Sequence, residues 1–107
     1  MKMKESDWKI FKQIKEKAIE RFCNLVLEEF REVIDDRETH VHNRYLLLYK
    51  LVNNRNKHMA LLFDGQSRSK ASLQLLAIRN DNLADEELLS KLSDDFLEET
   101  DPKRLNW

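Results

Sequence analysis

Residues 7–35 carry apolar side chains at the three- and four-residue spacing of a long amphipathic helix. Its broad apolar side comprises Phe11, Ile14, Ala18, Ile19, Phe22, Cys23, Leu25, Val26, Phe30, Val33 and Ile34. Ser6 is the expected N-cap, because its hydroxyl can accept a bond from a free backbone amide of the first turn. At 1.5 Å per residue such a helix is roughly 40 Å long, so it requires a long partner.

Residues 40–63 predict that partner. Their apolar stripe steps by four and three residues in strict alternation, which is the seven-residue repeat of coiled-coil-like packing. The stripe comprises Val41, Tyr45, Leu48, Val52, Arg55, Met59 and Leu62. Arg55 is its only charged member, so it requires a carboxylate partner and could set the register of the pair. The pair Asn53-Asn54 leaves open whether this helix is continuous or broken.

Two further segments complete the predicted architecture. Asp64-Gly65 ends the second helix, since glycine suits the left-handed conformation that follows a helix end. A third helix is expected over residues 68–79, with Ser67 or Ser69 as its cap, and a fourth from about residue 83 or 85. Ser93 could alternatively cap a separate short helix before Pro102 stops the chain.

The pattern therefore predicts an all-α fold in one domain of residues 1–107. The expected architecture is a helical bundle: an antiparallel hairpin of two long helices, closed by two or three shorter helices. Residues 1–5 and 103–107 are expected to be mobile.

Composition supports helices over sheets. The chain has one glycine and one proline in 107 residues, too few for the turns that a sheet needs. Charged residues make up 36% of the chain, which fits helices with one wet and one dry side.

The lone cysteine, Cys23, lies in an apolar helical stretch and has no partner for a disulfide within the chain. We interpret it as a reduced, partly buried thiol. No stretch is apolar for long enough to span a bilayer, and the first residues lack the apolar run of a secretory signal. A cytoplasmic location is therefore expected by elimination, without contact with a membrane.

Charge is divided unevenly along the chain. Residues 39–80 carry seven basic residues and one acidic residue, and residues 81–107 carry three basic and nine acidic residues. Clustered positive charge makes nucleic-acid binding an alternative function. Its candidate polyanion-binding residues are Arg44, Lys50, Lys57, Arg68 and Lys70. The favoured interpretation is that these cations pair with the acidic tail of the same or a neighbouring chain.

A second alternative is a Mg²⁺-dependent nucleotide hydrolase. Glu29 with Glu32, and Glu32 with Asp35, have the spacing that stacks two carboxylates on one helical face, which suits a hard cation. A solvated acidic surface is the favoured interpretation. His40 and His42 point nearly opposite ways on a helix, so a zinc site is not expected. We predict no catalytic residues, metal ligands or cofactor, and favour a protein that is not an enzyme.

The two long helices carry more apolar surface than a hairpin can hide within itself. Helices three and four could cover the excess, or a partner could. We favour a partner, and predict a protein–protein interaction or regulatory module that self-associates as a homodimer or binds a helical protein. The expected interaction residues are Phe22, Val26, Phe30, Leu48, Val52, Arg55 and Met59.

Overall fold

The computed structural model describes residues 3–65 and 67–107 and confirms the all-α prediction. Within these residues five helices succeed one another: α1 (Glu5–Asp35), α2 (Val41–Phe63), α3 (Arg68–Asn80), α4 (Glu86–Leu89) and α5 (Asp94–Glu99). The described chain contains no β-strand. The molecule is elongated, with extents of 53 × 26 × 23 Å.

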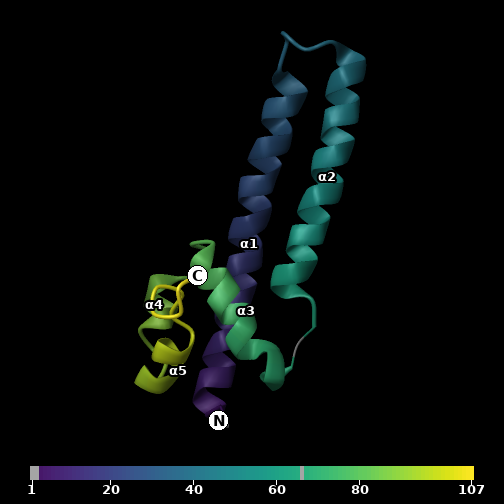
Figure 1. Ribbon diagram of the computed structural model, residues 1–107. Coiled ribbons are helices and arrows are strands. Elements are labelled where there is room, and N and C mark those ends of the chain that lie inside the picture. The colour runs from purple at the N-terminus through teal and green to yellow at the C-terminus, as the bar shows by residue number, and fades with distance from the viewer. Residues whose placement is uncertain (1–2, 66) are drawn as a thin grey trace.

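Helices α1 and α2 lie side by side and run in opposite directions, joined by a short turn at one end of the molecule (Figure 1). Helix α2 is continuous through Asn53 and Asn54, which answers the question that the sequence left open. Its N-cap is His40, whose ring nitrogen accepts a hydrogen bond from the amide of His42 at 3.2 Å.

The predicted start of the first helix was two residues too late. Helix α1 begins at Glu5, and the amide of Trp8 donates to the carbonyl of Lys4, so the first turn already closes there. Ser6 therefore lies inside the first turn, and the N-cap is Lys4, which makes no side-chain capping bond. Glu5 and Asp7 place negative charge at this end, where the helix dipole favours it.

The end of α2 agrees with the prediction. Asp64 is the C-cap, and Gly65 follows with a φ of +78°, a conformation that side chains with a Cβ rarely adopt. Two side chains hold this turn against the rest of the molecule. Lys15 donates to the carbonyl of Gly65 at 2.6 Å, and Gln74 donates to the carbonyl of Asp64 at 2.8 Å. Burial lowers the pKa of the Lys15 amine.

The last segment forms two short helices instead of one. Asp85 caps α4 by accepting from the amide of Leu88, and Ser93 caps α5 by accepting from the amide of Phe96. The alternative in which Ser93 starts a separate helix is therefore confirmed. The predicted mobility of residues 1–5 and 103–107 stays a prediction, and residues 1 and 2 lie outside the described residues.

The hydrophobic core occupies one end of the molecule. Helices α3, α4 and α5 gather around the N-terminal half of α1 (Figure 1). The core side chains are Phe11, Ile14, Ala18, Phe22, Val26, Leu62, Phe63, Ala71, Leu75, Ile78, Leu83, Ala84, Leu88, Leu89, Leu92 and Phe96. We call this part, residues 3–26 and 62–107 where described, the base.

Beyond the base, α1 and α2 continue as an unsupported pair. Residues 27–61, all of which the structure describes, include no buried residue. We call this pair of helices with its turn the arm. Among the described residues, no helix is long and apolar enough to cross a membrane.

Candidate interaction surface

Exposed apolar side chains are concentrated on the arm. Of the twelve large apolar side chains that are exposed in the described chain, eight belong to residues 27–61. They are Leu27, Ile34, Val41, Tyr45, Leu46, Leu47, Tyr49 and Leu61. Scattered single exposed apolar residues are ordinary on a protein surface, but a contiguous group marks an interaction site.

One stripe of this group follows α2. Val41, Tyr45, Tyr49 and Val52 succeed each other at spacings of four, four and three residues, so they share one side of the helix. Val41, Tyr45 and Tyr49 are 64%, 67% and 63% exposed. This side is rotated by about a quarter turn from the side that faces α1 and carries Arg55.

A second stripe follows α1. Leu27, Phe30 and Ile34 are on average rotated by about a quarter turn, in the direction of increasing residue number, from the side of α1 that carries Phe22 and Val26 and lies against α2. Both helices are right-handed and they run antiparallel, so the two quarter turns lead to the same side of the pair. We call the combined surface of Leu27, Phe30, Ile34, Val41, Tyr45, Tyr49 and Val52 the apolar face.

The apolar face points away from the short helices. His58, on the other flank of α2, bonds to Asp81 just after α3 at 2.9 Å and packs edge-on against Phe22. Leu25, on the corresponding flank of α1, lines a pocket with Asp81 and Leu83. Helix α3 and the segment after it therefore cover one flank of the hairpin near the base, and leave the opposite flank open.

The residues predicted to bind a partner divide into three groups. Phe22 and Val26 are buried in the core of their own chain. The sequence pattern assigned these two core residues to an interface. Leu48 is half-buried on the arm, and Met59 is half-buried and packs against the core. Phe30 and Val52 are half-buried and belong to the apolar face.

Arg55 has the carboxylate partner that the sequence required. Its guanidinium donates two hydrogen bonds to the carboxylate of Glu29, at 2.8 and 2.6 Å. This bidentate contact lowers the pKa of Glu29 and raises that of Arg55. Arg55 thus sets the register between α1 and α2 within one chain, and is not offered to a partner.

Several residues of the apolar face were absent from the prediction: Leu27, Ile34, Val41, Tyr45 and Tyr49. Val41 and Tyr45 belong to the predicted heptad stripe of α2, but only Leu48, Val52, Arg55 and Met59 of that stripe were predicted to bind a partner. Tyr49 follows Tyr45 by four residues and is the signal that a second stripe runs beside the first.

The basic residues predicted to bind a polyanion do not converge. At the tip, Arg44 donates to the carbonyls of Thr39 and Ile34. At the opposite end, Arg68 pairs with Glu5 at 2.7 Å and lies over the Trp8 ring. Lys50 and Lys57 are exposed on the outer side of α2, and Lys70 is exposed in α3.

Within the one described chain, the basic segment pairs with the acidic tail only in part; pairing with the tail of a neighbouring chain stays a prediction. Among the described residues, the partner of Arg55 is Glu29 and that of Arg68 is Glu5, both in α1. Three contacts with the tail are seen among the described residues. Asp81 bonds to His58, and Glu99 accepts from Ser72. Arg79 donates to the carbonyl of Leu97 and to the hydroxyl of Thr100.

The carboxylates considered for Mg²⁺ are not assembled either. Glu29 is occupied by Arg55. In the described part of the chain, no group of three His, Cys, Asp or Glu side chains is close enough to hold a metal ion.

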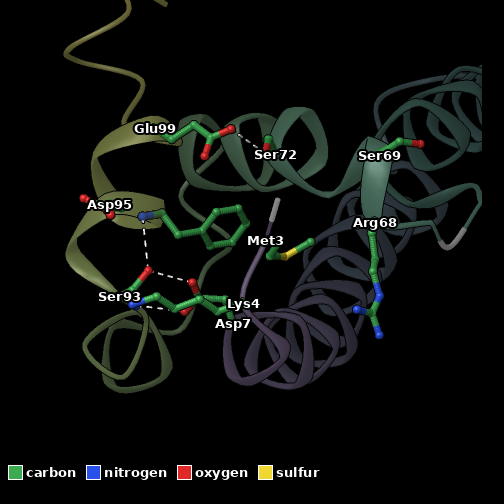
Figure 2. Close-up of a pocket in the computed structure, with 10 residues that line it drawn as sticks. Met3, Lys4, Asp7, Arg68, Ser69, Ser72, Ser93, Asp95 and Glu99 are labelled. Atoms are coloured by element: carbon green, nitrogen blue, oxygen red, sulfur yellow. Dashed lines mark hydrogen bonds between the residues drawn. The ribbon is translucent and has the colours of Figure 1, made fainter. Parts of the chain in front are cut away.

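A pocket of about 230 Å³ lies in the base, between the start of α1, α3 and α5 (Figure 2). Four of its polar lining residues are bonded in two pairs. The carboxylate of Asp7 accepts from the amide of Ser93 at 2.9 Å and from its hydroxyl at 2.6 Å, and Ser72 donates to Glu99 at 3.0 Å. These bonds fasten α5 to α1 and α3, so the pocket is part of the scaffold.

Comparisons with protein-family models, with curated proteins and with solved structures found no match for this chain.

Proposed function

We propose that this protein is an interaction module that self-associates through the apolar face of its arm. One observation carries the proposal: residues 27–61 comprise the last nine residues of α1, the turn and most of α2, and none of them is buried, yet eight of their large apolar side chains are exposed.

An isolated helical hairpin of this kind is poorly stabilised by itself. Most helical stability in proteins comes from packing an apolar side against another element, and short helices without it are marginal in water. Two hairpins that pack face to face form a four-helix arrangement, in which each covers the other's apolar side chains.

The size of the face fits a reversible dimer. Two adjacent helices are roughly 20 Å wide, and the stretch from Val41 to Val52 is about 18 Å long. Packing such a face buries on the order of 500 Å² per protomer, near the lower limit for specific interfaces. We therefore expect a dimer that dissociates on dilution.

The α2 part of the apolar face carries no charge that would repel a second copy. Along α2, the successive face positions Val41, Tyr45, Tyr49, Val52 and Asn56 carry no charge. Like charges directly opposite one another would oppose self-pairing, and here there are none along the stripe of α2.

The test is light scattering coupled to size-exclusion chromatography over a dilution series. Wild-type protein should shift from dimer to monomer as it is diluted. Tyr45→Glu should be monomeric throughout with unchanged circular dichroism, because an exposed substitution leaves the folded monomer intact. The matched control is Leu46→Glu, which places the same charge on the outer side of α2 and should leave the dimer in place.

A wild-type protein that is monomeric at every concentration would refute the proposal. Equal weakening by Tyr45→Glu and Leu46→Glu would place the contact elsewhere on the arm.

A further inference from the structure

We infer that the two copies pair α2 against α2 in antiparallel orientation, with the two-fold axis passing between Tyr45 and Tyr49. The inference rests on the proposed function and specifies the geometry of the same surface.

The stripe on α2 reads the same from both ends: Val41, Tyr45, Tyr49, Val52. In an antiparallel pair centred near position 47, Tyr45 lies opposite Tyr49 of the partner subunit. Val41 then faces the position next to Val52 of the partner subunit. The two valines are therefore offset by about 1.5 Å along the helix axis. A two-fold interface requires a self-complementary patch of this kind, in which each contact occurs twice.

The aromatic pairs supply most of the contact. Tyr45 and Tyr49 are each more than 60% exposed in the single chain, and Tyr45 would stack on Tyr49 of the partner subunit in each of two equivalent pairs. Their hydroxyls can remain at the wet edge of the bundle, so that no polar atom need be stranded in the contact.

Helix α1 widens the contact without changing its symmetry. The guanidinium of Arg44 reaches the carbonyl of Ile34, so Ile34 lies level with the first turn of α2. Ile34 and Phe30 share the apolar face and would pack beside the α2 pair in the face-to-face four-helix arrangement.

Charge favours the antiparallel orientation over the parallel one. Towards the base, the same side of α1 continues into polar residues, where Lys9, Lys12 and Glu16 line a groove. A parallel pair would bring the lysines of both copies to one end of the dimer. The antiparallel pair separates the two bases to opposite ends, and only the arms overlap.

Cysteine cross-linking tests the orientation. In a Cys23→Ser background, Tyr45→Cys and Tyr49→Cys are prepared as separate proteins and oxidised mildly, alone and as a mixture. The antiparallel register predicts a disulfide-linked dimer in the mixture and little in either protein alone, because only positions 45 and 49 face each other closely enough for a disulfide. Leu46→Cys, on the outer side of α2, measures random collision.

A second measurement keeps both tyrosines. Spin labels at Asn56→Cys, again in the Cys23→Ser background, should be separated along the bundle axis by about 27 Å, since each lies nine residues from the centre at 1.5 Å per residue. A parallel pair would hold them level with each other, within about 15 Å across adjacent helices.

The outcomes separate the two proposals. Efficient cross-linking of either single-cysteine protein with itself, or a short label distance, overturns the antiparallel register and leaves self-association through the arm intact. A dimer by light scattering that yields neither the mixed disulfide nor the long distance also overturns it. A protein that is monomeric throughout refutes the proposed function itself.

Discussion

Helix α1 runs through both the base and the arm, yet the two parts are stabilised in different ways. In the base, Phe11, Ile14 and Ala18 of α1 are fully buried beneath α3 and α4. In the arm, the same amphipathic helix continues: Phe30 still packs against the core, but Leu27, Val33 and Ile34 are only half-buried or exposed. The difference shows that an amphipathic pair of helices forms no core until a further element packs on its apolar side.

Polar contacts follow the same division. The base is fastened by groups that are largely withdrawn from solvent: Asp7 to Ser93, and Lys15 to Gly65. The arm relies on the pair Glu29–Arg55, whose side chains remain 39% and 32% exposed. Such partly solvated pairs set register more than they add stability. The arm is therefore the part of the molecule that a partner would stabilise most.

The largest expected effect is a cavity in the base. Phe11→Ala should lower the free energy of unfolding by about 3–5 kcal/mol, because it removes a fully buried ring from a packed core. Leu61→Ala, at an 82% exposed position of the arm, should change it by less than about 0.5 kcal/mol. The measurement is chemical denaturation of both variants at a protein concentration well below the dissociation constant of the proposed dimer. Comparable losses in the two variants would contradict the division into base and arm.

A smaller effect is expected from the buried anchor of α5. Asp7→Ala should cost about 2–3 kcal/mol, since both the amide and the hydroxyl of Ser93 lose a charged acceptor. Glu16→Ala removes an exposed carboxylate from the same helix and serves as the control. The measurement is the denaturation midpoint, and a loss no larger than that of the control would show that Asp7 is not an anchor.

The smallest effect concerns the ion pair of the arm. The bond from Arg55 lowers the pKa of Glu29 below its usual 4.5. The unfolded state then binds the proton more readily, so the contribution of the pair is present above about pH 4.5 and is lost as the pH falls through the lower, folded-state pKa. We expect less than about 1 kcal/mol.

Glu29→Gln should reduce the loss of unfolding free energy as the pH falls below about 4.5. Glu32→Gln, three residues further along α1, should not. The readout is the free energy of unfolding between neutral and acid pH, followed by circular dichroism. If the unfolding free energy falls with pH equally in wild-type protein and in Glu29→Gln, the Glu29–Arg55 pair does not contribute to stability.

Much of the fold could be predicted from local sequence. The ranges of the three longer helices, the left-handed Gly65 and the cap at Ser93 all depend on residues within a turn or two of one another. Arg55 was also predictable as a residue that needs a carboxylate, because it interrupts an otherwise apolar stripe. Its partner Glu29 was not, because that pairing depends on how two helices align across the turn at residues 36–40.

The candidate surface shows where the sequence stops being informative. Phe22 and Tyr45 both occupy apolar helical stripes, and nothing local distinguishes the one that becomes core from the one that stays exposed. The sequence by itself determined that the chain is helical, where its longer helices lie and which sides of them are apolar, because these follow from spacing along one helix. Only the tertiary structure decided which flank remains open, because α3 returns along one side of α1 and ends at the base, held there by contacts between residues far apart in the chain.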